Sequence, residues 1–209
     1  GGGYGLGDGR YDFTELVMRN SRSFVVVSIQ YRLGAFGFMS SSELASFGVP
    51  NAGLYDQHFA LQWVQKYITQ FGGDPGKVTI AGQSAGGGAV LQQTLAYGGI
   101  EGTRYFTNAI VASPYLPPQR QFNAKQPTNT YDAFIRQVGC NNQLGSAAVF
   151  KCLSSKDTYT LQNASAYVSI NADYGQWAFL PVVDEIFIQE NPVEQLLAGR
   201  VNGLRILSG

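Results

Sequence analysis

Charged residues, histidine and cysteine are all scarce in this chain. Only 13% of the 209 residues are charged, 14 basic residues balance 14 acidic ones, and the sequence holds one histidine and two cysteines. The balanced charge and the lack of a basic run exclude a protein that binds nucleic acid through a positively charged surface. No run of about 18 apolar residues is present, so the sequence predicts no membrane span. We expect neither a metal site nor a cofactor.

Glycine and apolar residues are abundant instead. Hydrophobic residues make up 44% of the chain, enough for one domain with a real core. Many of the 26 glycines cluster in residues 1–9 and 82–88, which suggests a backbone role at a site. The chain begins at Gly1 with no signal-like segment after it, and residues 204–209 resemble a truncated strand. We therefore expect residues 1–209 to form a single partial domain, a fragment of a longer protein.

The motif Gly82-x-Ser84-x-Gly86 is the most informative stretch. An apolar, β-branched run precedes it at residues 78–81, and a helix-compatible run follows at residues 89–96. This strand–turn–helix context is that of a nucleophile elbow, where a tight turn lifts the serine Oγ above a sheet. Glycines keep side chains out of the turn, and the helix N-terminus stabilises an oxyanion. The spacing predicts Ser84 as a nucleophile.

The glycines of residues 1–9 do not form a phosphate cradle. No frame gives G-x-G-x-x-G, and no strand precedes them in this sequence. Two alternatives stay open: a flexible terminus, or an oxyanion loop whose bare N–H groups approach a substrate oxygen closely. A P-loop is also excluded, because Phe71 and Val78 stand where that motif needs Gly and Ser or Thr.

Hydrophobic patterning predicts alternating strands and helices. The continuous β-branched run at residues 24–29 indicates a strand buried on both faces. Further strands are expected at residues 77–81, 108–112 and 204–207, and helices at residues 12–20, 54–70, 89–96, 131–138, 147–153 and 191–197. This order predicts an α/β fold with a parallel sheet. The proline- and glutamine-rich residues 113–130 are predicted as a surface excursion.

Several polar residues outside the elbow suggest structural roles. Arg32 lies among apolar residues and is expected to pair with a buried carboxylate. His58, the single histidine, is expected at a surface or supporting position on a helix, not as a catalytic base. Cys140 and Cys152 are compatible with one disulfide, worth about 3 kcal/mol, or with two free buried thiols. Asn163 opens the only Asn-x-Ser/Thr acceptor, which is consistent with secretion.

Taken together, these motifs resemble the type-B carboxylesterases, an α/β-hydrolase family that includes cholinesterases, fungal lipases and neuroligins. The resemblance covers nearly the whole chain. It rests on residues 1–4, 31–38, 56–64, 71–86, 181–184 and 207–209. It implies an α/β-hydrolase fold, a central and mostly parallel sheet flanked by helices, here incomplete.

The resemblance also implies roles for individual residues. Ser84 would be the nucleophile of an acyl-enzyme mechanism. Gly2, Gly3 and Ala85 would supply the N–H groups of a three-donor oxyanion hole. Trp177 falls in the segment that lines the acyl side of the pocket in relatives.

Gln83 and Tyr4 are further candidates for substrate contact. Cholinesterases and several lipases of the family carry Glu at the position of Gln83, and a neutral amide argues against a cationic choline ester. Cys140 and Cys152 match the positions of a disulfide within the chain in relatives.

The triad of this family continues with a Glu and then a His, and neither has a match in this sequence. Asp184, Glu185 and Glu190 do not fit the Glu position, and His58 matches a variable helix position. We therefore expect the fragment alone to be nearly inactive, with the base outside it.

The leading hypothesis is a secreted serine carboxylester hydrolase acting on small-molecule or lipid esters. A non-catalytic interaction module like the neuroligins is one alternative, although those proteins typically lack the elbow serine. A serine hydrolase of amides or thioesters is the other.

Overall fold

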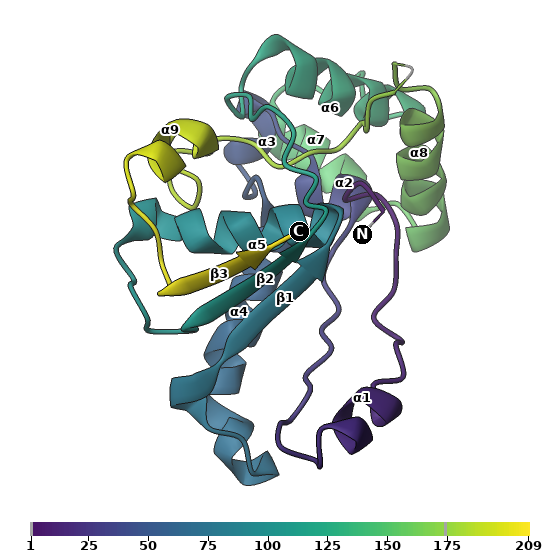
Figure 1. The fold of residues 1–209 in the computed structure, drawn as a ribbon. Coiled ribbons are helices and arrows are strands. Elements are labelled where there is room, and N and C mark those ends of the chain that lie inside the picture. The colour runs from purple at the N-terminus through teal and green to yellow at the C-terminus, as the bar shows by residue number, and fades with distance from the viewer. Residues whose placement is uncertain (1, 174) are drawn as a thin grey trace.

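The computed structural model describes residues 2–173 and 175–209 (Figure 1). Its sheet consists of three parallel strands, in the order β1 (Thr79–Gln83), β2 (Asn108–Ala112) and β3 (Arg205–Ser208). Ala81 of β1 lies in register with Ile110 of β2. The prediction of a parallel α/β sheet is confirmed.

Helices occupy much of the remaining chain. The α-helices are α1 (Thr14–Arg19), α2 (Gly34–Phe38), α3 (Ser42–Ala45), α4 (Ala52–Tyr67), α5 (Ala85–Leu95), α6 (Lys125–Gln137), α7 (Ser146–Ser154), α8 (Thr158–Ile170) and α9 (Pro192–Leu197). Short 3-10 turns are η1 (Ile68–Phe71), η2 (Pro75–Lys77) and η3 (Ala96–Gly99). Helix α5 packs against β1 and β2, and α4 packs against α5, so both lie behind the sheet in Figure 1. No described helix covers the opposite face, where Ile110 is 40% exposed. The flanking layers are therefore incomplete.

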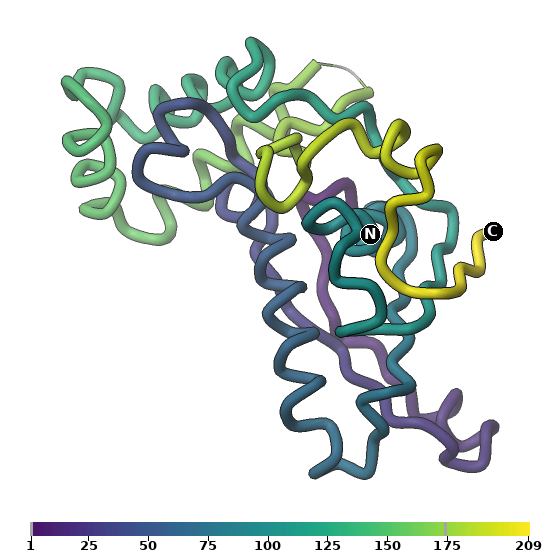
Figure 2. Tube along the Cα trace, turned by 90° about the vertical axis from the view of Figure 1, so that its left-hand side faces the viewer, coloured from purple at the N-terminus to yellow at the C-terminus, as the bar shows by residue number. Residues whose placement is uncertain are grey.

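Two groups of buried side chains form the core. The smaller group, Val90, Ala109 and Val111, fills the space between α5 and the sheet. The larger group joins Tyr4 and Leu54 to side chains of α6, α7 and α8. Figure 2 shows these three helices gathered at one end of the molecule, away from β3. The described residues thus form a partly built α/β layer with a helical group attached.

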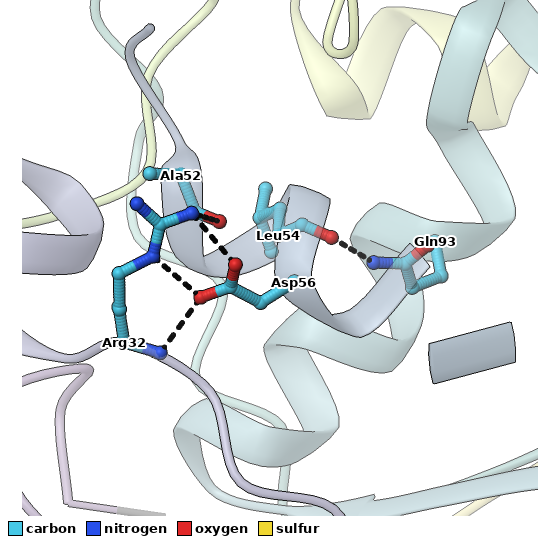
Figure 3. Close-up of polar contacts among 5 residues, drawn as sticks. All are labelled: Arg32, Ala52, Leu54, Asp56 and Gln93. Carbon is cyan, nitrogen blue, oxygen red and sulfur yellow. Dashed lines mark hydrogen bonds and ion pairs between the residues drawn. The ribbon is translucent and has the colours of Figure 1, made fainter. Parts of the chain in front are cut away.

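Two contacts fix α4 against its neighbours (Figure 3). Arg32 donates from Nε to Asp56 Oδ2 over 2.8 Å and from a terminal nitrogen to Oδ1 over 2.6 Å. Gln93 of α5 donates to the carbonyl of Leu54 over 3.0 Å. Partial burial acts to raise the pKa of Asp56, but the hydrogen bonds from Arg32 outweigh it and the pKa is lowered. The predicted ion pair of Arg32 is confirmed, although its carboxylate is only partly buried.

The predicted strand at residues 24–29 is wrong for the chain as described. These residues run extended beside residues 5–13 in both views but belong to no sheet, and Phe24, Val25 and Val27 are exposed. The hydroxyl of Ser28 donates to the Gly9 carbonyl, without a backbone ladder between the two stretches. A strand is defined by its pairing partners, and sequence propensity alone does not supply them.

Candidate active site

Ser84 occupies the single residue between β1 and α5, and its backbone is strained. Its φ is 56° and its ψ is −123°, a conformation that an L-residue rarely adopts. The turn is so tight that a Cβ built on Gly82 would lie 2.2 Å from the carbonyl oxygen of Gly86. Gly82 is therefore required by close backbone approach. The predicted strand–turn–helix context of Ser84 is confirmed.

Backbone hydrogen bonds fix Ser84 at both of its polar groups. Its N–H donates to Ala112 of β2 over 3.0 Å, and its carbonyl accepts from Gly88 over 2.9 Å and from Tyr115 over 2.8 Å. The hydroxyl does not cap α5 and makes no hydrogen bond within the described part of the chain. Ser84 is half-buried, and its hydroxyl is the one polar group of the residue without a hydrogen bond in the described chain.

Residues 2–6, the glycine loop, form a left-handed turn. Gly1 lies outside the described residues. Gly2, Gly3 and Tyr4 have φ values of 75°, 59° and 66°. The carbonyl of Gly2 accepts from the N–H groups of Gly5 and Leu6, over 3.0 Å and 3.2 Å. The N–H groups at the start of this turn belong to no helix or sheet ladder of the described chain.

Tyr4 ties this loop to the elbow. Its ring is fully buried, and its hydroxyl donates to the carbonyl of Tyr115 over 3.1 Å. A Cβ on Gly88 would lie 2.4 Å from that hydroxyl and 2.0 Å from the Tyr115 carbonyl oxygen. Burial raises the pKa of Tyr4, which keeps its hydroxyl a donor. The structure thus places Tyr4 in the core, between loop and helix, and not on an open wall.

Trp177 lies against the glycine loop. A Cβ built on Gly3 would fall 1.9 Å from the indole ring, so the ring packs on bare backbone. Trp177 keeps 37% of its surface exposed. Two segments separated by more than 170 residues in sequence therefore meet here, and the structure brings Gly3 and Trp177 together as neighbours.

A buried polar network anchors the segment that follows Trp177. The Asn51 side chain accepts from the Val182 N–H over 2.9 Å and donates to Asp184 Oδ2 over 2.9 Å. The other carboxylate oxygen of Asp184 accepts from the N–H groups of Phe187 and Ile188, over 2.8 Å and 2.9 Å. Buried groups satisfied on all sides rigidify their surroundings.

Sequence reasoning missed three of these residues as parts of the site. Tyr115 lay in the predicted surface excursion, yet it is half-buried and bonds both the elbow and the loop. Asn51 and Asp184 are 133 residues apart, and no local pattern links them. Asn51 has a φ of 58°, and asparagine is one of the few non-glycine residues enriched in that region.

The remaining candidates divide between sheet, core and helical group. Gln83 is exposed at the end of β1, and Ala85 is buried at the first position of α5. Cys140 and Cys152 form the predicted disulfide, which closes a separation of 12 residues. The described residues contain no cluster of three or more metal-ligand side chains.

His58 is buried, which corrects the expectation of a surface position. Its ring contacts the rings of Tyr97, Tyr105 and Phe187, with centroids 4.7–5.6 Å away. Its Nε2 lies 3.6 Å from a carboxylate oxygen of Glu101. Burial lowers the pKa of His58, so the ring is neutral near pH 7. These contacts describe a packed core histidine.

A cavity of about 260 Å³ lies beside the segment of Trp177. Its wall includes Tyr115, Pro127 and Phe179, and it is mostly apolar. Ser84, Gly3 and Trp177 are not among its lining residues, so it is a neighbour of the elbow and not its mouth. No helix in the ranges described is both long and apolar enough to cross a bilayer.

The sequence of this chain is similar to those of known proteins. The carboxylesterase family profile matches residues 1–209. The chain belongs to the carboxylesterase family. It is 33% identical to the secreted triacylglycerol lipase LIP1 of Gibberella zeae, over 218 residues that cover all of this chain and 37% of that protein. It is 36% identical to carboxylesterase patB of Aspergillus clavatus, covering 90% of this chain and 33% of that protein.

Solved structures agree with the sequence comparison. EstA of Aspergillus niger superposes with a TM-score of 0.87 at 32% identity, covering 99% of this chain and 40% of its own. The fold of this carboxylesterase-family chain is therefore the α/β-hydrolase fold, incomplete here. The chain spans roughly a third to two-fifths of the length of these relatives.

Proposed function

We propose that the whole protein is a serine hydrolase of carboxylic esters that acts through an acyl-enzyme on Ser84. The observation that carries this proposal is the strained Ser84, fixed by its backbone between β1 and α5 with its hydroxyl unbonded. Strain of this kind persists only where the surroundings enforce it, and it is concentrated at functional sites. Membership of the carboxylesterase family supports the same reaction class.

In the proposed reaction, Ser84 Oγ attacks the ester carbonyl carbon and its proton passes to a general base. The N–H groups of Gly2, Gly3 and Ala85 stabilise the oxyanion that forms. The alcohol leaves with the proton from the base, and the acyl group stays on Oγ. Water then attacks the acyl carbon, releases the acid and restores the hydroxyl.

We place the base and its orienting carboxylate outside residues 1–209. The chain has one histidine, and its ring is buried among Tyr97, Tyr105 and Phe187. Without a base, a serine site keeps a residual acceleration of about 10³–10⁴ over water. Isolated residues 1–209 should therefore hydrolyse p-nitrophenyl butyrate at most at that residual level.

Three further residues receive proposed roles. Trp177 lines the acyl side of the pocket, because its indole lies against the oxyanion loop and remains partly exposed. Gln83 is a neutral neighbour of the nucleophile and favours uncharged alcohols over choline. Tyr4 positions the loop through Tyr115 and does not touch substrate, which replaces its expected role in substrate binding.

The proposed substrates are small-molecule or lipid esters, and the proposed location is outside the cell. Relatives named as lipases and carboxylesterases support the first point. Relatives named as secreted, together with the disulfide between Cys140 and Cys152, support the second.

A fluorophosphonate probe on the whole protein tests the proposed function. Ser84 should be labelled, and Ser84→Ala should remove both the label and hydrolysis of p-nitrophenyl butyrate. Ser113→Ala is a matched control, because Ser113 also has a positive φ but lies outside the elbow. Absence of Ser84-dependent labelling would favour the non-catalytic module. Labelling with amide or thioester turnover, but no ester turnover, would favour another acyl class.

A further inference from the structure

An exposed apolar stripe with an asparagine at its centre runs along α8. Tyr159, Asn163 and Tyr167 stand four residues apart, which places them one above the other on a single helix face. Tyr159 is 74% exposed and Tyr167 is 52% exposed, and Ile170 continues the stripe at 82%. Large apolar side chains seldom gather on an open helix face without a function.

The opposite face of α8 packs against the core of the protein. Ala164 and Val168 are buried in the main core, against α6 and α2. The hydroxyl of Ser165 accepts the N–H of Ala35 at the start of α2, over 3.1 Å. Helix α8 is therefore fixed in orientation, and Asn163 points away from the rest of the described chain. Helix α8 lies on the outer side of the helical group in Figure 1, and Asn163 is exposed.

Asn163 is also chemically free. Its side chain makes no hydrogen bond within the described residues, and Ser165 completes the only Asn-x-Ser/Thr acceptor of the sequence. We propose that Asn163 carries an N-linked glycan whose first sugars cover the rings of Tyr159 and Tyr167. Tyrosine offers an apolar ring face with a polar edge, which suits the mixed surface of a sugar. The glycan would turn the stripe into a solvated surface.

Glycosylation of Asn163 is a substitution at the anomeric carbon of the sugar donor. The donor is an oligosaccharide activated as a lipid diphosphate, as found in the secretory pathway. Its anomeric carbon–oxygen bond breaks, the diphosphate leaves with the electron pair, and Asn163 Nδ2 bonds to that carbon and loses a proton. The inference rests on the proposed secretion but not on the chemistry of Ser84.

The first test is mass spectrometry of the whole protein, expressed in a eukaryotic host that performs N-glycosylation. We expect hexose and N-acetylhexosamine units on the peptide that contains Asn163, and their removal by peptide N-glycosidase. Asn163→Gln should abolish them and Ser165→Thr should keep them. Ser165→Ala should abolish them and also remove the acceptor for Ala35, so Asn163→Gln is the cleaner variant.

The second test asks where the glycan lies. Hydroxyl-radical labelling of Tyr159 and Tyr167 should rise roughly two-fold once the glycan is removed, because one ring face is uncovered. Tyr11 is the matched control, since it is also 74% exposed but lies beside α1. An unmodified Asn163 in protein recovered from the medium would overturn the inference and leave the proposed esterase intact. Protein retained inside the cell would overturn the proposed secretion and the glycan with it. Equal labelling before and after removal would refute the coverage of the tyrosines.

Discussion

Replacing Gly3 by alanine offers the sharpest test of how the glycine loop and Trp177 depend on each other. The new methyl carbon would lie 1.9 Å from the indole ring, whereas ordinary contact begins at 3.4 Å. The ring or the loop must therefore move by about 1.5 Å. Gly72→Ala is the matched control, because Gly72 has a φ of 81° with no atom within 4 Å of an added Cβ.

Gly3→Ala loses stability for two reasons, a strained backbone and a steric clash, whereas Gly72→Ala loses it only for the first. An alanine held in the left-handed region costs about 1–2 kcal/mol. Forcing an extra methyl group into packed surroundings costs about 1–3 kcal/mol more. The free energy of unfolding should thus fall by about 2–5 kcal/mol for Gly3→Ala and about 1–2 kcal/mol for Gly72→Ala.

A double-mutant cycle separates the two costs. In a Trp177→Ala background the clash is gone, so Gly3→Ala should cost only the backbone part. The double variant should therefore lose about 1–3 kcal/mol less stability than the sum of the losses in the two single variants. Trp177 and Gly72 should show no coupling.

The assays are urea unfolding and hydrolysis of p-nitrophenyl butyrate by the whole protein. A shift of about 1 Å in an oxyanion donor should lower kcat/KM by about 10²-fold for Gly3→Ala, with Gly72→Ala unchanged. Equal stability loss in both variants, with no coupling to Trp177, would refute the packing argument. Equal stability loss together with full activity would remove Gly3 from the proposed oxyanion hole.

Three further predictions concern stability. Replacing both Cys140 and Cys152 by serine should lower the free energy of unfolding by about 3 kcal/mol, measured in urea, and reducing the wild-type disulfide should reproduce the loss. The pKa of Asp56 is lowered, since hydrogen bonds from Arg32 outweigh burial, so its stabilising contribution is present above its ordinary value of 3.8 and is lost as the pH falls through the folded value. Asp56→Asn should remove that part of the acid sensitivity in a urea series at falling pH, and an unchanged slope would contradict the reasoning. The pKa of His58 is lowered by burial, so the unfolded chain binds the proton first and the wild type should lose stability below pH 6.5. His58→Gln should flatten this loss, and an equal loss in the variant would place its cause elsewhere.

The elbow and the parallel sheet could be predicted from sequence because their signals are local. Five residues fix the turn around Ser84, and the runs on either side identify the strand and the helix. The disulfide needed the family resemblance, since spacing alone left two free thiols possible. Residues 24–29 show the limit of local reasoning: the run favours a strand, but a strand also needs neighbours that its own sequence does not encode.

The elements missed from sequence are the ones that join distant segments. Tyr115 follows β2 in a stretch whose prolines indicate a surface loop, and nothing local shows that its N–H and carbonyl serve two different elements. His58 was expected at a surface or supporting position on its helix. Its burial depends on Tyr97, Tyr105 and Phe187, which come from three other parts of the chain.

The arrangement around Tyr115 explains two of the glycines in the first turn of α5, Gly87 and Gly88, where their low helix propensity is costly. The Tyr115 N–H donates to the Ser84 carbonyl, and its own carbonyl accepts from the buried Tyr4 hydroxyl. Both bonds require this segment to lie directly against the first turns of α5. A side chain at Gly88 would meet the Tyr115 carbonyl at 2.0 Å, and one at Gly87 would meet Pro114 at 3.1 Å. These glycines weaken the helix, but they let the segment of Tyr115 approach α5 closely enough to connect the elbow with the glycine loop.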